Sequence, residues 1–150
     1  MTTSSTVPKT TGRLGLIEVT AEPLDLAAQL ASVQDLTTGA LASFLGVVRN
    51  HDHDVGVTAL RYEAHPEAVN LLTRVAAEIA TLPGVQGVSV THRYGDLLPG
   101  DIALIAVVAT SHRGDAFDAC RALVEQVKAE IPVWKRQTYT NGSHDWVNCA

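Results

Sequence analysis

The feature that most limits the fold is an uninterrupted apolar run, Ile102 to Ala109, which follows the turn residues Pro99-Gly100-Asp101. A strand with one face in water alternates apolar and polar side chains, whereas this run is apolar at every position. It has the length of a strand and is too short to span a bilayer. The run therefore predicts a strand buried on both faces in the middle of a sheet.

Three segments have the pattern of helices that could pack on such a sheet. Residues 66–82 and 114–130 carry apolar side chains at intervals of three and four, the spacing of one helix face. A shorter helix is expected over residues 23–33. The apolar stripe of the last helix is predicted to contain Phe117, Cys120, Val124, Val127 and Ile131. Strands are expected at residues 14–19, 40–48, 58–64, 85–94, 102–109, 133–139 and 145–147.

These elements together indicate the fold class. Several neighbouring strands are joined by short turns, and strands joined in this way pair antiparallel. We therefore predict the α+β class: one domain with three helices packed on a mainly antiparallel sheet. Residues 1–13 are rich in Ser and Thr and are expected to form a disordered tail, so that 14–150 is the single domain.

The composition excludes several functional classes. The hydrophobic fraction of 46% suits an ordinary core, and the net charge of −5 argues against nucleic-acid binding, which usually shows as a basic excess. Because the N-terminus has no apolar segment, we expect no secretory signal, no membrane association and a cytoplasmic protein. Cys120 and Cys149 form no CxxC pair, so neither a disulfide framework nor a thiolate zinc site is expected.

The chain has only 11 Lys and Arg residues, so their positions are informative. Arg49 follows a strand, and Arg113 stands where a strand leads into a helix, whose free N–H groups attract anions. An arginine there offers a two-pronged donor suited to phosphate. Lys128 lies at the border of an apolar stripe in the last helical turn, and Lys135 and Arg136 follow a proline turn. If these residues converge, they form one cationic pocket.

Each of these residues also has an ordinary interpretation. Arg49 could be a solvated loop residue, and Lys128 could simply complement the dipole at a helix C-terminus. The segment His51-Asp52-His53-Asp54 has the residue types of a metal site, but so short a loop rarely supplies three ligands. We therefore expect a solvated loop there and no metal.

Four short segments, taken in order, resemble the large, catalytic subunit of the molybdopterin synthases. The similarity extends from about Gly39 to Val147, and its most specific pieces come at the expected spacing. They are Gly46-Val47-Val48-Arg49-Asn50, then His92-Arg93-Tyr94-Gly95 with Pro99-Gly100-Asp101, then Ser111-His112-Arg113 with Ala116-Phe117, and finally Lys128 through Pro132-Val133-Trp134-Lys135-Arg136.

The resemblance implies an α/β hammerhead-type fold and a defined reaction. A small ubiquitin-like sulfur-carrier subunit brings a C-terminal Gly-Gly thiocarboxylate, and two sulfurs pass in two rounds to cyclic pyranopterin monophosphate, which yields the dithiolene of molybdopterin. The family suggests a homodimer within a heterotetramer, and the chain needs no cofactor of its own. By this match the catalytic residues are Lys128 and Lys135, and the substrate-binding residues are Arg49, His112, Arg113, Arg136 and Gln137.

The residue types suit that chemistry. The sulfur nucleophile arrives with the partner, so the chain needs no reactive cysteine. Arg113, Lys135 and Arg136 offer cations for a phosphate. Lys128 is our choice for moving protons, with His112 as a second candidate, because imidazoles exchange protons near neutral pH.

Two other functions are compatible with the same residues. A non-catalytic phosphate- or nucleotide-binding module would use Arg113 and Lys135 but would not need Lys128. A metal-dependent hydrolase would instead depend on residues 51–53.

Overall fold

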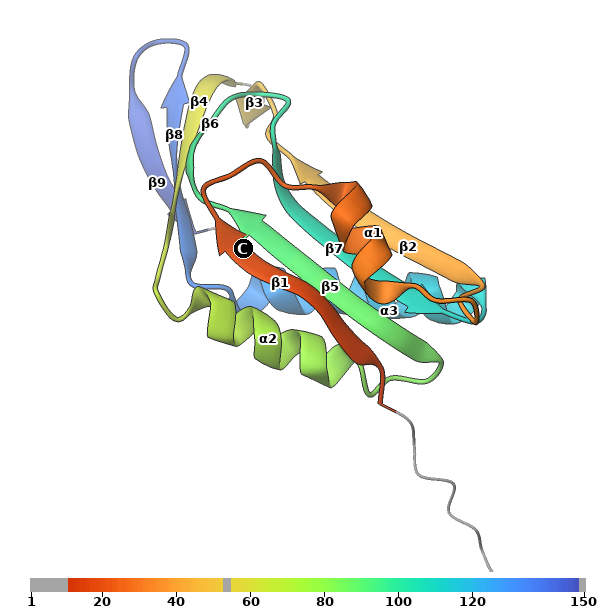
Figure 1. The fold of residues 1–150 in the computed structure, drawn as a ribbon. Helices are drawn as coiled ribbons and strands as arrows, with labels where there is room; N and C mark the ends of the chain where they lie inside the picture. The colour runs from red at the N-terminus through yellow and green to blue at the C-terminus, as the bar shows by residue number, and fades with distance from the viewer. Residues whose placement is uncertain (1–10, 53–54, 149–150) are drawn as a thin grey trace, which may run out of the picture.

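The computed structural model describes residues 11–52 and 55–148. Along the chain, its elements are β1 (Arg13–Thr20), α1 (Leu26–Val33), β2 (Ala40–Val47), β3 (His51–Asp52), β4 (Val55–Ala64), α2 (Ala68–Ile79), β5 (Val85–Arg93), β6 (Gly95–Leu97), β7 (Ile102–Thr110), α3 (Arg113–Glu130), β8 (Val133–Tyr139) and β9 (His144–Asn148). The predicted α+β class with three helices and mainly antiparallel strands is confirmed (Figure 1). The strands form two sheets rather than one.

The larger sheet has the strand order β1-β5-β7-β2, with β7 between two antiparallel neighbours. Alternate residues of β7 enter two separate cores. Ile105 and Val107 pack with Val33 of α1, whereas Leu104 and Ala106 belong to the core that α2 and α3 cover. This explains why the run at 102–109 is apolar at every position. The pairing of β1 with β5 is parallel, and the long segment between these strands in the chain supplies the crossover that a parallel pair requires.

The smaller sheet has the order β3-β4-β8-β9, with β6 also paired to β4. It lies at the end of the larger sheet where β2 and β5 finish and β7 begins (Figure 1). Two parts of it differ from the sequence predictions. Residues 95–97, which lie between two expected strands, form β6, and the segment between the expected strands at 40–48 and 58–64 contains β3 and the start of β4. His53 and Asp54 lie outside the described residues.

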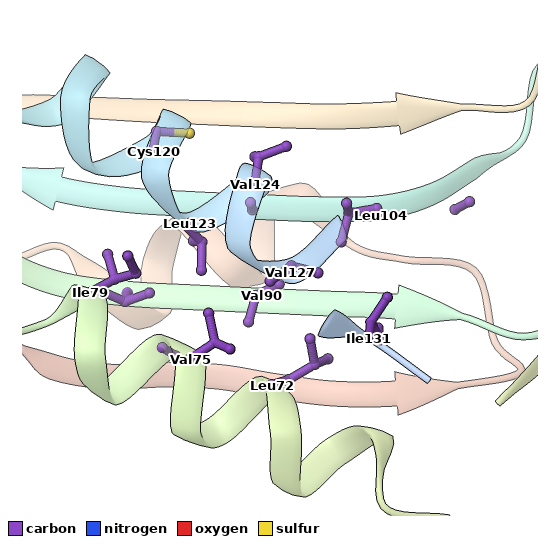
Figure 2. Close-up of a cluster of buried hydrophobic side chains, with 14 of the residues drawn as sticks. Leu72, Val75, Ile79, Val90, Leu104, Cys120, Leu123, Val124, Val127 and Ile131 are labelled. Carbon is purple, nitrogen blue, oxygen red and sulfur yellow. The ribbon is translucent and has the colours of Figure 1, made fainter. Parts of the chain in front are cut away.

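Helices α2 and α3 pack side by side on one face of the larger sheet. Leu72, Val75 and Ile79 of α2 and Leu123 and Val127 of α3 are all buried between helix and sheet (Figure 2). The predicted stripe of α3 is confirmed at four of its five positions.

Phe117 is the exception, because it is 66% exposed. It lies near the start of α3 beside β2, which is the edge strand, so the sheet ends before it can cover this position. No helix in the described part of the chain is long and apolar enough to cross a membrane.

Candidate active site

Helix α3 sets the position of Lys128. The helix ends at Glu130 because Pro132 keeps Ile131 in an extended conformation, with φ −64° and ψ 127°. Lys128 therefore lies in the last turn, beside the buried Val127, and is itself half-buried. A cation is favourable there because the C-terminal end of a helix carries partial negative charge.

Strand β8 places Lys135 and Gln137 on the same side as the core. In the antiparallel register with β4, Lys135 lies opposite Tyr62 and Gln137 lies opposite Leu60. Directly opposed residues share a face of the sheet, and Tyr62 and Leu60 are both buried. Gln137 is buried as well and accepts a hydrogen bond from the Tyr139 hydroxyl at 3.0 Å.

Arg136, the neighbour of Lys135, lies on the other face of this sheet. It is opposite Arg61 in β4 and Trp146 in β9, and its guanidinium stands 5.8 Å from the centre of the Trp146 ring. Successive side chains on a strand point to opposite faces. The structure thus separates Arg136 from Lys135 and Gln137, which the sequence predicted to share one pocket.

A residue outside the predicted set, His92, lies near Lys128 and contacts Tyr62, the residue opposite Lys135. It is only 3% exposed, and its Nδ1 lies 2.8 Å from the carbonyl oxygen of Arg93. Its ring meets that of Tyr62 edge to face, with centroids 5.2 Å apart. Burial lowers the pKa of His92 from 6.5 to about 4, and the positive charge of Lys128 contributes to this shift. Two groups therefore lie near this imidazole: Lys128, and Tyr62 of β4, which is the residue opposite Lys135.

The sequence carries a signal for His92 beyond its place in the family motif. The residue continues the apolar row of Val88 and Val90 along one face of β5. A histidine in such a row must be buried, and a buried histidine needs polar partners. The sequence gives no such signal for Tyr62 as a site residue, because aromatic side chains are common on the buried face of a half-buried strand.

Burial of His92 predicts a loss of stability in mild acid. The unfolded chain binds a proton as pH falls below about 6.5, whereas the folded chain does so only near pH 4. The neutral imidazole therefore does not reduce the free energy of unfolding above about pH 6.5. As pH falls from there towards 4, the free energy of unfolding declines. We expect about 2 kcal/mol less free energy of unfolding from this group at pH 5 than at pH 7. Urea unfolding at both values measures it.

The matched variant is His92→Gln, which has no group that titrates in this range. Carboxylates elsewhere contribute equally to both proteins, so subtracting the two pH dependences isolates His92. Equal pH dependences in the wild type and the variant would contradict the assignment of a buried, neutral imidazole.

Arg49 stands at the same end of the molecule as Lys128. It follows β2, whose Val47 pairs with the first residue of β7, and α3 runs towards that end (Figure 2). Hydrogen bonds fix the chain on both sides of it. Val48 donates its N–H to the carbonyl of Asp101, and the carbonyl of Asn50 accepts from Val57. The backbone on both sides of Arg49 is thus fixed, and the Arg49 side chain is exposed.

His112 and Arg113 lie at the opposite end of α3. His112 is the N-cap and Arg113 the first residue of the helix, and both are exposed. Arg113 and Lys128 are fifteen positions apart, which corresponds to roughly 22 Å of helix at 1.5 Å per residue. Within one chain, the structure does not bring these two groups to the lysines.

A groove of about 400 Å³ lies between β2 and α3. Its lining residues are Leu41, Ala42, Ser43, Phe44, Phe117, Cys120, Arg121, Val124 and Glu125. Arg113 precedes Phe117 by one helical turn and Lys128 follows Val124 by one turn. The same face of α3 therefore carries a cation at each end of an apolar groove.

Metal-binding side chains do not gather in the described residues: no group of three His, Cys, Asp or Glu there could hold an ion. The predicted metal-like segment is described only at His51 and Asp52. Cys120 is buried, and burial raises the pKa of its thiol, which disfavours the reactive thiolate.

Comparison with known proteins agrees with this arrangement of elements. Residues 19–130 match the family described as MoaE protein. The chain belongs to the MoaE protein family. It is 37% identical to molybdopterin synthase catalytic subunit 1 of Mycobacterium tuberculosis, over 86% of this chain and 88% of that protein. This family membership makes the chain an enzyme of molybdenum cofactor biosynthesis, a sulfurtransferase of the molybdopterin synthase type.

Two solved structures share the MoaE fold of this chain. The crystal structure of molybdopterin synthase from Staphylococcus aureus has a TM-score of 0.81 and 31% identity, covering 87% of this chain and 96% of that one. A complex of subunits 1 and 2 of molybdopterin-converting factor from Helicobacter pylori has a TM-score of 0.67 and 22% identity, covering 89% of each chain. The second likeness concerns the fold alone.

Proposed function

We propose that this chain transfers sulfur from the C-terminal thiocarboxylate of a small ubiquitin-like protein to cyclic pyranopterin monophosphate in the cytoplasm. Lys128 and Lys135 are the catalytic residues of this proposal. The observation that carries it is the contact between His92, on which the charge of Lys128 acts, and Tyr62, which lies opposite Lys135 in the smaller sheet. A phosphate-binding module would have no use for a half-buried lysine at this position.

The residues suit each requirement of the reaction. The attacking sulfur belongs to the partner's thiocarboxylate, which agrees with a buried Cys120 of raised pKa. Lys128 moves protons as the ring phosphate opens and water leaves. Lys135 and Arg49 lie at the same end of the molecule and supply positive charge for the phosphate and for the negative tail of the partner. Gln137 lies on the same face as Lys135 and offers a polar contact.

A second copy of the chain would complete the site. Strand β2 forms one edge of the larger sheet, and Phe117 is an exposed apolar side chain beside it. Exposed edges and apolar patches of this kind favour association. A twofold axis that sets two β2 edges antiparallel brings Arg113 and His112 of one copy towards Arg49 and Lys128 of the other. We therefore propose a homodimer in which each substrate site uses both chains.

The sulfur donor is the other partner in this proposal. The Helicobacter pylori structure is a complex of subunits 1 and 2 of molybdopterin-converting factor, so a protein of this fold assembles there with a second subunit. An extended Gly-Gly tail has almost no side chains to grip, so its binding depends on backbone hydrogen bonds and on its negative end. One small subunit beside each pair of lysines gives a heterotetramer.

Deleting the two C-terminal glycines of the sulfur carrier tests the partner. We expect the truncated carrier to bind this chain measurably, because its globular body supplies most of the interface, but to give no molybdopterin. Binding is measured by calorimetry and product by reconstitution with thiocarboxylated carrier and cyclic pyranopterin monophosphate. The full-length carrier is the control. Precursor binding without sulfur transfer from that carrier would favour the phosphate-binding module instead.

A further inference from the structure

A histidine at position 92 is unusual for its surroundings. The residue is 3% exposed and extends the apolar row of Val88 and Val90 on the face of β5 that α2 and α3 cover. Burying a polar ring costs free energy unless its nitrogens are bonded, and an apolar side chain would pack here without that cost. The contact with the Arg93 carbonyl satisfies one nitrogen, Nδ1. Packing alone does not explain why the side chain here carries a second ring nitrogen, Nε2.

The contacts of this ring lead to both proposed catalytic lysines. On one side the ring meets Tyr62 edge to face, and Tyr62 lies directly opposite Lys135 in the register of β4 and β8. Lys128 directly follows Val127, which packs in the same core as Val90 of β5 (Figure 2), and its charge acts on the imidazole. Lys128 belongs to α3 and Lys135 to β8. His92 belongs to a third element, β5, and its surroundings include Lys128 and the neighbour of Lys135, Tyr62.

We infer that His92 is a positioning residue for the proposed sulfur transfer, setting the spacing of Lys128 and Lys135 through its contacts with both sides of the site. This inference rests on the function proposed above. A carbonyl oxygen can only accept a hydrogen bond, so Nδ1 must carry the ring proton, and Nε2 is left as an acceptor. The neutral ring therefore keeps a lone pair at Nε2 and adds no positive charge to a site that already holds Lys128.

Three substitutions separate the roles of the two ring nitrogens. The amide nitrogen of His92→Asn can replace Nδ1 at the Arg93 carbonyl but does not reach the position of Nε2. The longer His92→Gln reaches it, and His92→Phe keeps a ring without either nitrogen. We expect His92→Gln to retain most of the saturating rate of sulfur transfer. His92→Asn and His92→Phe should lose roughly ten- to a hundredfold, the scale of a small misplacement of catalytic groups.

Because Lys135 also supplies charge for the phosphate, the KM for the precursor should rise in the variants that lower the rate, whereas the affinity for the carrier, which comes mostly from its globular body, should stay within about twofold of wild type. Thr91→Val is the matched control. Thr91 is the preceding residue, is 3% exposed, and donates a buried hydrogen bond of 2.7 Å to Gln29 on the opposite face of the strand. The control should reduce stability by a similar amount and leave the transfer rate normal.

A second measurement does not need turnover. Competitive acetylation, read by mass spectrometry against an added lysine derivative, reports the reactivity of Lys128 and Lys135 separately. We expect His92→Asn and His92→Phe to change both reactivities and Thr91→Val to change neither. Wild-type reactivity in His92→Phe, or a wild-type transfer rate in His92→Asn, would overturn the inference. A wild-type chain that transfers no sulfur would instead sink the proposed function, while the labelling would still decide the role of His92.

Discussion

Replacing Lys128 by alanine is expected to lower the rate of sulfur transfer by roughly 10²- to 10⁴-fold, the usual contribution of a general acid–base group. The side chain lies in the last turn of α3 and is half-buried, next to His92. Its removal leaves the apolar contacts of Val127 and Ile131 in place, so thermal unfolding and carrier binding should remain close to wild type. Single-turnover formation of molybdopterin from thiocarboxylated carrier measures the loss.

Lys128→Arg distinguishes two ways in which the lysine could act. Arginine keeps the positive charge but remains protonated at all working pH values, so it cannot exchange protons with the substrate. We expect normal carrier binding and a rate as low as that of the alanine variant. A near-normal rate in Lys128→Arg would show that position 128 supplies charge alone, and near-normal turnover in Lys128→Ala would remove it from the mechanism.

Two inactive variants are expected to restore activity to each other when mixed. If each site combines Lys128 of one copy with Arg113 of the other, Lys128→Ala and Arg113→Ala homodimers both have two damaged sites. A mixed dimer has one site with both substitutions and one site with neither. Random pairing makes half of the dimers mixed, so about a quarter of all sites should be intact. Co-refolding the two variants and measuring turnover tests this.

The control for complementation is a pair of variants from the same end of one chain. We expect Lys128 and Lys135 of one site to come from one chain, around His92. A mixed dimer of Lys128→Ala and Lys135→Ala then has one substitution in each site, so no activity returns. A chain carrying both Lys128→Ala and Arg113→Ala, mixed with wild type, should likewise leave every mixed site damaged. No recovery from Lys128→Ala with Arg113→Ala would contradict the shared site.

Much of the fold could be predicted because local sequence and tertiary packing agree. The apolar run at 102–109 is the central strand β7, and Pro132 ends α3 where expected. The exposure of Phe117 could not be predicted, because the width of the helix-covered sheet depends on which strand forms its edge. The division into two sheets was missed for a similar reason, since strand periodicity carries no information on which strands pair.

The candidate site was predicted less well, because distance along the chain is a poor guide to distance in space. Arg113 and Lys128 belong to one helix, and its length alone separates them by roughly 22 Å. Strand alternation should have separated Lys135 from Arg136 already in the sequence, because neighbours on a strand face opposite ways. His92 could not be linked to Lys128 from the sequence, because their proximity arises only from the packing of β5 against α3.

The short connection between α3 and β8 constrains how the gene for this chain can change. Only Ile131 and Pro132 separate the helix that carries Lys128 from the strand that carries Lys135. Insertion or loss of a single codon here would shift β8 by one residue against β4 and exchange its two faces. Loss of the codon would put Arg136, and insertion would put Trp134, in the place of Lys135 beside Tyr62, and in both cases the buried Gln137 would turn to water. Length variation among descendants of this sequence is therefore confined to places such as the turn at 140–143, where β8 and β9 meet.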